Sequence, residues 1–400
     1  MQIKLIALAS LLASASGAGT GVGNISTIVA YCAVSTMVTA ALCIYARAFG
    51  AATDLIDRPD GVLKLHSAET PLIGGLALLL PSFTVSFVYF SQAAPTSFMV
   101  VALTAALVIL VVGVIDDRYG LSPVFRLGAL ALVVFLVFAT EPLLMLHALR
   151  FGVHGDNFGV ALGIWAAPIT ALMIIGFVNA SNMADGMNGQ LLGSVLIWSI
   201  FLSQYLGFEV GMPFIAIICS AAVTLAFNLK GRLFSGSSGS YAASLFVALG
   251  TIAAYRQSEN TMPAEEPVFW FWLPVLDCVR LMVSRVAAGK SPLFGDRNHI
   301  HHILQDYARW PYALVIYLGL LAAPGVAAMF NDLLGGVMLG LCIAVYATLL
   351  VMRKRVQAVR EASLAGPATG AVLAALATPR SAISANPEPA EKRANMELTG

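Results

Sequence analysis

The sequence predicts an all-α fold, a polytopic transmembrane helical bundle of about 11 spans with its active site in loops on one membrane face. Of its 400 residues, 59% are hydrophobic and 11% are charged, whereas ordinary soluble domains carry about 25% charged residues. Apolar runs long enough to cross the ~30 Å core of a bilayer recur with only short gaps between them. Most of the unusual polar residues fall in alternate gaps, which lie on the same side of a membrane.

The apolar runs define the expected spans and the organisation of the chain. Residues 25–355 form one predicted transmembrane domain, and three short gaps, 92–96, 208–210 and 331–332, make helical hairpins of the spans beside them. The expected spans are 25–48, 70–91, 97–115, 124–141, 159–178, 190–207, 211–228, 239–255, 268–286, 312–330 and 333–352.

The two ends of the chain differ from this domain. Residues 1–24 begin with Lys4, an apolar run and small residues in the manner of a signal peptide, and both a cleaved and an uncleaved extension remain open. Residues 356–400 are rich in Ala, Pro, Ser and charge, which predicts a disordered tail. The five cysteines lie inside apolar segments without ligand spacing, so we expect buried free thiols.

The distribution of Lys and Arg predicts the orientation. The gaps that hold the polar residues, together with the tail, carry most of the cations, whereas the opposite face carries little beyond Arg150 and Arg256. Because cytoplasmic loops are enriched in Lys and Arg, these gaps and the C-terminus are expected in the cytoplasm and the start of the first span outside. The net charge of +1 gives no sign of a nucleic-acid partner, and we expect none.

Asp116 and Asp117 end the third apolar run. Two adjacent carboxylates at a membrane boundary repel each other and are costly to desolvate unless a cation lies beside them. Their hard oxygen atoms suit Mg²⁺ and, through it, a substrate diphosphate. The alternative is a pair of solvated loop acids, and the other polar gaps on the same face favour the metal site.

The gap from Asn179 to Gly189 contains Asn182, Asp185 and Asn188. Its two glycines permit a tight turn with exposed backbone amides. Amides, carboxamides and one carboxylate together suit a phosphate, a metal ion or a sugar hydroxyl, although an ordinary polar turn has a similar composition.

Arg297, His299, His301 and His302 lie between the ninth and tenth spans. Three histidines in four residues suggest zinc, but no cysteine or glutamate is spaced to complete such a site. Phosphate binding or acid–base chemistry fits better because imidazole changes its charge near neutral pH. A solvated polar loop is the alternative.

Two further gaps are basic or glycine-rich. Lys64 and His66 precede the second span, where they are placed to bind a lipid phosphate or to act only as topology determinants. The gap from Asn228 to Ser240 suits an anion cradle of backbone amides, or a flexible linker. Asp277 and Arg280, three residues apart in the ninth span, predict a local ion pair that supports the site.

In this order, the motifs resemble the polyprenyl-phosphate N-acetylhexosamine-1-phosphate transferases, a family that includes the phospho-N-acetylmuramoyl-pentapeptide transferases. The resemblance runs from about Asp54 to Leu304, through every predicted cytoplasmic loop. It is carried by Asp57-x-Pro59 with Lys64-x-His66, by Asp116-Asp117, by Asn179-x-x-Asn182-x-x-Asp185-Gly186-x-Asn188-Gly189, and by Arg297-x-His299-x-His301-His302. The His-x-His-His form resembles the branch that uses simple UDP-N-acetylhexosamines.

One motif departs from the family. The family has Phe-x-Gly-Asp-x-Gly-Ser where this chain has 234–240, so Ser237 stands in the place of an aspartate that the family is thought to use on its Mg²⁺. A hydroxyl is a weaker ligand than a carboxylate. The departure leaves open a catalytically impaired relative that binds lipid or nucleotide-sugar. A transporter is disfavoured because transporters place charged groups near the bilayer midplane.

The resemblance implies transfer of a sugar 1-phosphate from a UDP-sugar to polyprenyl phosphate, such as undecaprenyl phosphate, with release of UMP at the start of cell-envelope glycan synthesis. It also implies Mg²⁺, or Mn²⁺, as cofactor, a multi-pass protein of the bacterial inner membrane, and a possible homodimer. The implied catalytic and metal-binding residues are Asp116, Asp117 and Asp185. The implied substrate-binding residues are Lys64, His66, Asn179, Asn182, Asn188, Asn228, Arg297, His299, His301 and His302.

Overall fold

The computed structural model describes residues 25–58, 69–92, 97–153, 156–257, 262–292 and 297–364. The chain divides into two compact units, Met1–Cys342 and Ile343–Gly400, and the division falls within the last helix. The predicted boundaries at 24 and 355 stay predictions.

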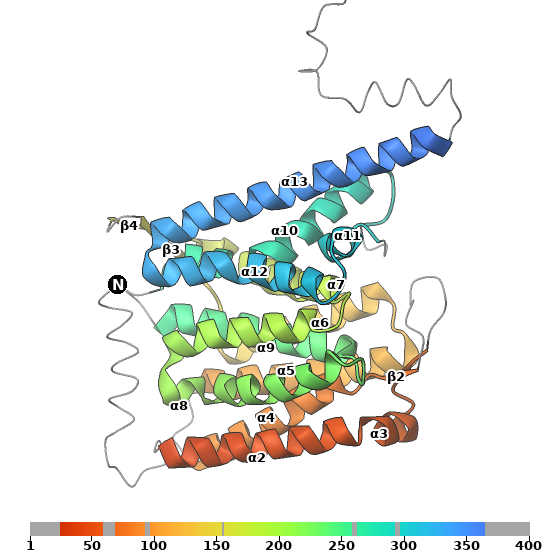
Figure 1. Ribbon diagram of the computed structural model, residues 1–400. Helices are drawn as coiled ribbons and strands as arrows, with labels where there is room; N and C mark the ends of the chain where they lie inside the picture. The colour runs from red at the N-terminus through yellow and green to blue at the C-terminus, as the bar shows by residue number, and fades with distance from the viewer. Residues whose placement is uncertain are drawn as a thin grey trace, which may run out of the picture. The chain divides into compact units, whose positions relative to one another are not determined.

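The described residues are overwhelmingly helical, which confirms the predicted fold class (Figure 1). Among them, ten helices are long and apolar enough to cross a membrane, and Gln190–Leu206 is a shorter apolar helix. The helices are α2 (Ile25–Ile44), α3 (Ala46–Thr53), α4 (Gly74–Gln92), α5 (Ser97–Tyr119), α6 (Pro123–Thr140), α7 (Ala166–Ala184), α8 (Gln190–Asn228), α9 (Gly236–Gln257), α10 (Glu265–Ala287), α11 (Ile300–Tyr307), α12 (Tyr312–Phe330) and α13 (Asp332–Leu364), with two 3-10 turns, η1 (Pro142–Leu144) and η2 (Gly163–Trp165).

Helix α8 folds back on itself. A straight helix of its 39 residues would be about 58 Å long. The backbone N–H of Gly189, just before α8, nevertheless donates to Oδ1 of Asn228, its last residue, at 2.5 Å. The two ends of α8 therefore meet, as the predicted hairpin near 208–210 requires.

Helix α9 is the most buried of the candidate spans and contacts α4, α5, α7 and α8. Small residues explain its position. A Cβ atom at Gly113 of α5 or Gly75 of α4 would overlap the backbone of α9 at Ser238 or Gly239. Because small residues let helix backbones approach closely within a membrane, the glycines bring α4 and α5 against the first turn of α9.

Buried hydroxyl groups join three spans. The Ser220 hydroxyl of α8 lies 2.8 Å from that of Ser35 in α2, 3.0 Å from that of Thr39, and 3.0 Å from that of Ser82 in α4. All four residues are fully buried. Interhelical hydrogen bonds of this kind contribute about 0.6 kcal/mol each in a membrane.

The predicted span 159–178 is wrong at both ends. Strand β3 (Ala148–Val153) pairs antiparallel with β4 (Asp156–Ala161), and α7 begins only at Ala166 and continues to Ala184. Alternation of apolar and small residues around a Gly-Asp pair is typical of a β-hairpin. The later end of α7 places Asn179 and Asn182 on a helix rather than in a loop. A second short pair, β1 (Ile56–Asp57) with β2 (Thr70–Pro71), precedes α4.

Candidate active site

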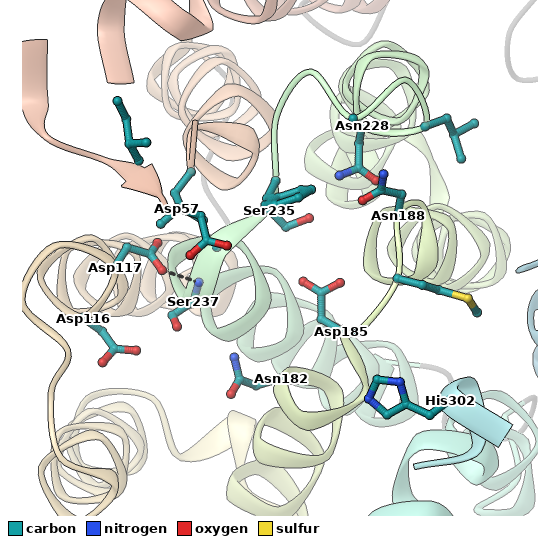
Figure 2. Close-up of a pocket in the computed structure, with 18 of the residues that line it drawn as sticks. Asp57, Asp116, Asp117, Asn182, Asp185, Asn188, Asn228, Ser235, Ser237 and His302 are labelled. Carbon is teal, nitrogen blue, oxygen red and sulfur yellow. Dashed lines mark hydrogen bonds between the residues drawn. The ribbon is translucent and has the colours of Figure 1, made fainter. Parts of the chain in front are cut away.

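A pocket of about 1160 Å³ lies where the polar gaps meet, at one end of the spans. Figure 2 shows carboxylates and amides from several elements pointing into it. Residues of all five polar gaps line it, including Asp57, Asp117, Asp185, Asn228, Ser237 and His302. The tertiary structure thus brings together segments that the sequence only placed on one membrane face.

Asp117 caps the first turn of α9. Its Oδ1 accepts the backbone N–H of Ser237 at 2.6 Å, and its Oδ2 accepts that of Ser238 at 3.0 Å (Figure 2). The free amides and the helix dipole at an N-terminus favour a negative charge. The predicted anion cradle is therefore present, and a carboxylate of the chain itself occupies it.

Gly236 makes this cap possible. It has φ of +71°, and a Cβ atom there would overlap the carboxylate of Asp117. We expect Gly236→Ala to lower the free energy of unfolding by about 2–3 kcal/mol, from left-handed backbone strain plus loss of the cap. Thermal unfolding and turnover of the purified protein measure the effect.

Gly120→Ala is the matched control, because Gly120 has φ of +67° but no atom within 4 Å of its Cβ position. The Gly120→Ala variant should lose only the free energy of left-handed backbone strain, about 1 kcal/mol. Equal losses in the two variants would show that contact with Asp117 does not matter.

Asp116 points to a different partner. Its Oδ2 accepts from Arg126 Nη1 at 3.0 Å and its Oδ1 from the backbone N–H of Leu121 at 2.8 Å. Arg126 belongs to α6, which begins after a turn capped by Ser122. From the sequence, Arg126 counted only among the cations that indicate orientation, and its place ten residues after Asp116 was the one signal of this pair.

Asp185 follows the last residue of α7 and lies near Asp117. Burial raises its pKa to about 7, a backbone hydrogen bond from Leu191 opposes the rise, and the negative charge of Asp117 adds to it. Such a pair is stabilised by a cation between or beside its members. The local electrostatics therefore favour a positive ligand at this point of the pocket.

The protein supplies only some of the oxygen ligands that Mg²⁺ requires. Among the described residues, no group of three or more His, Cys, Asp or Glu is arranged to hold a metal ion. Mg²⁺ is commonly held by one or two carboxylates together with water and substrate phosphates. Asp117 and Asp185 meet that requirement, Ser237 adds a neutral oxygen, and Asp116 is engaged by Arg126.

The asparagines have different partners. Asn182 donates to the Ser240 hydroxyl at 2.6 Å, which ties α7 to α9. Asn228 accepts from Gly189 and donates to the Leu233 carbonyl at 2.9 Å, so it fixes two loops of the pocket. Asn179 donates back to the Ile175 carbonyl at 2.8 Å and is not among the residues that line the pocket.

Only one of the three histidines lines the pocket. His302 does so together with Arg297, whereas His299 and His301 are buried behind them. The rings of His299 and His301 stack at 5.5 Å, and those of His301 and His302 lie 4.2 Å apart. Burial and the neighbouring imidazoles lower the pKa of His301 well below its usual value, so it is neutral. Its imidazole fills the space that a side chain at Gly186 would need.

Asp277 holds this stack in place. Its Oδ2 accepts from His299 Nδ1 at 2.9 Å and from the Ile300 N–H at 3.1 Å, and its Oδ1 accepts from Arg280 at 2.7 Å. The predicted Asp277–Arg280 pair is confirmed, and its larger role is to bind α10 to the start of α11.

Lys64 and His66 lie outside the described residues. Conversely, Asp57, Lys230 and Trp310 line the pocket without a role assigned from the sequence. The indole N–H of Trp310 donates to the Asn188 carbonyl at 3.3 Å. The sequence held signals that could have identified two of them as site residues. Asp57 belongs to the first quoted motif, and Lys230 is a cation beside the glycine-rich loop.

Comparison with known proteins agrees with the motifs. The profile of glycosyl transferase family 4 matches residues 98–255. The undecaprenyl-phosphate alpha-N-acetylglucosaminyl 1-phosphate transferase of Yersinia pestis is 30% identical over 266 residues, which cover 62% of this chain and 69% of that protein. The decaprenyl-phosphate N-acetylglucosaminephosphotransferase of Mycobacterium tuberculosis is 28% identical over 338 residues, covering 73% and 81%.

A probable undecaprenyl-phosphate N-acetylglucosaminyl 1-phosphate transferase of Bacillus subtilis is 27% identical over 278 residues, covering 66% of this chain and 74% of that protein. The matched segment 98–255 contains the acidic pair, the 179–189 motif and the first turn of α9. Together with the ordered motifs and the helical bundle, these similarities show that the chain belongs to glycosyl transferase family 4 and is a polytopic membrane phosphotransferase.

Proposed function

We propose that this protein transfers an N-acetylhexosamine 1-phosphate from a UDP-sugar to polyprenyl phosphate, with release of UMP. The observation that carries the proposal is that Asp117 and Asp185 line one pocket together with residues of all the polar gaps. The names of the relatives, which specify polyprenyl phosphates and N-acetylglucosamine, support the acceptor and the sugar.

The charges of the pocket suit two anionic substrates. The carboxylates of Asp117 and Asp185 and the cations Lys230 and Arg297 line the same pocket. Mg²⁺ or Mn²⁺ held by the two carboxylates would supply charge neutralisation for the donor diphosphate. Positioning and charge stabilisation account for most of the catalysis of phosphoryl transfer.

The residues of the chain then take the following roles. Arg297 and His302 bind the diphosphate or sugar of the donor, and Asn182 and Asn188 contact the donor through their amides. Asp116, held by Arg126, orients the end of α5 so that Asp117 faces α9. Lys64 and His66 remain the proposed contacts of the lipid phosphate.

The orientation follows from the same cations. We place the pocket on the cytoplasmic face of a bacterial inner membrane, where nucleotide-sugars are made, with the N-terminus outside and the C-terminus inside. The enrichment of Lys and Arg on the pocket side and the bacterial relatives support this placement.

The direct test is UMP release by the purified protein with UDP-N-acetylglucosamine or UDP-N-acetylgalactosamine, undecaprenyl phosphate and Mg²⁺. We expect release that requires both the lipid phosphate and the divalent cation. Absence of UMP with every UDP-sugar and cation tried would contradict the proposal.

Ser237 supports a second candidate, an impaired relative that binds its ligands without efficient turnover. The backbone N–H of Ser237 is bonded to Asp117, so a carboxylate at this position would join the acidic pair. We expect Ser237→Asp to lower the Mg²⁺ concentration for half-maximal binding about tenfold. Without Mg²⁺ the variant should unfold more easily, because like charges repel.

Turnover of the same variant separates the two candidates. Rates within a few fold of the natural chain support an active transferase, whereas a gain of about 100-fold or more, ~2.7 kcal/mol of barrier, supports the impaired relative. Ser91→Asp is the control, because Ser91 is exposed near the end of α4 farthest from Gly74 and the pocket.

A further inference from the structure

The hairpin of β3 and β4 lies at the end of the bundle opposite β2 and α11 (Figure 1), and α11 carries the pocket residue His302. Its register pairs Leu149 with Val160 and Phe151 with Phe158. Because directly opposed residues share a face and alternate residues of a strand do too, these four apolar side chains form one face. The other face carries Arg150, opposite Gly159.

The face with Arg150 is fixed to the helices. The Arg150 guanidinium lies 4.6 Å from the centre of the Tyr255 ring and donates to the Tyr255 carbonyl at 2.7 Å. A Cβ at Gly152 would meet Pro263 at 3.2 Å, and the Gly152 N–H donates to Glu265 at 3.0 Å. This inner face therefore joins the end of α9 to the start of α10.

The outer face is exposed along β4, at Phe158 and Val160, and half-buried along β3, at Leu149 and Phe151. Phe158 is 65% exposed and Val160 is 40% exposed, and the Phe151 and Phe158 rings stack at 6.4 Å. An apolar surface of this kind outside the spans marks a contact with a membrane or another protein.

Exposed apolar residues also follow the hairpin along the chain, into the next span. Ile164 and Trp165, in the 3-10 turn after β4, are 89% and 62% exposed. Leu172 of α7 follows Trp165 by seven residues, nearly two helical turns, and is 72% exposed. An apolar face on a candidate span at that position faces lipid, so Trp165 lies where α7 enters the bilayer, a place typical of tryptophan.

We propose that the outer face of this hairpin, formed by Leu149, Phe151, Phe158 and Val160, lies on the membrane and inserts into the boundary between lipid headgroups and acyl chains. The hairpin then acts as an interfacial anchor, amphipathic in the same sense as a surface-bound helix. The continuity along the chain with Trp165 and Leu172 selects lipid, rather than a second copy of the chain, as the occupant.

The test uses the full chain in nanodiscs of phosphatidylethanolamine and phosphatidylglycerol. Cysteines introduced as Phe158→Cys and Val160→Cys carry an NBD fluorophore on the outer face. Gly159→Cys labels the opposite face of the same strand, where a Cβ meets only the Leu149 carbonyl at 4.0 Å. The natural chain, whose described cysteines are buried or half-buried, gives the labelling background.

We expect brominated lipid to quench NBD at positions 158 and 160 at least about twofold more than at 159, and aqueous iodide to show the reverse order. Equal quenching at the three positions, or stronger iodide quenching on the outer face, overturns the proposal. Excimer fluorescence between pyrene labels at position 160, without lipid quenching, would assign the face to a second copy. Should Phe158→Cys not fold, Val160→Cys carries the same comparison.

Discussion

Asp117→Asn is expected to reduce transfer of the sugar phosphate by at least about 100-fold, equivalent to ~2.7 kcal/mol of transition-state stabilisation. The carboxylate accepts two backbone amides of α9 and faces Asp185 across the pocket. An asparagine keeps one acceptor oxygen, loses the charge that favours a cation, and presents an N–H₂ group to a backbone N–H. UMP release and the thermal stability of the purified variant measure the two consequences.

Asp54→Asn is the control for this substitution. Asp54 forms an exposed pair with Arg58 at 3.1 Å, and exposed pairs contribute little to stability. Its activity should stay within about twofold of the natural chain. Full activity in Asp117→Asn would rule out both the proposed metal-binding role and the requirement for a charged cap on α9.

Asp277→Asn is expected to raise the KM for the UDP-sugar by at least about tenfold and to lower kcat/KM by about 100-fold. One carboxylate holds His299, the Ile300 N–H and Arg280, and loss of a buried hydrogen-bonded charge costs about 3 kcal/mol locally. The histidine stack would then shift, and His302 with it. Because His302 lines the pocket and is the proposed contact of the donor, the KM for polyprenyl phosphate should change less.

Arg280→Gln tests how Asp277 acts. Arg280 is partly exposed, and its loss leaves both bonds of Asp277 to the start of α11 in place. We expect a smaller loss than in Asp277→Asn, because the carboxylate keeps its bonds to His299 and Ile300. A loss as large as that of Asp277→Asn would assign the effect to the ion pair rather than to the positioning of His299, and equal changes in both KM values would indicate a general loss of structure.

Hydropathy predicted most of the fold. The candidate spans follow the apolar runs, and the fold-back of α8 agrees with the short gap near 208–210. The error at 159–178 arose because the hairpin of β3 and β4 is itself apolar on one face, so its strand alternation merged with the run that begins α7. Over so short a segment, a two-residue period is a weaker signal of structure than the long apolar run that follows it.

The sequence by itself determined that this is a membrane protein of glycosyl transferase family 4 whose polar motifs share one face, since hydropathy and motif order are properties of the chain alone. Only the tertiary structure decided what each polar side chain does. Asp116 and Asp117 are neighbours, but successive residues on a helix point about 100° apart. One therefore meets Arg126 and the other meets α9. Likewise, Asp277 holds His299, the ring of His301 stacks on that of His299, and His302 is the one of the three that lines the pocket.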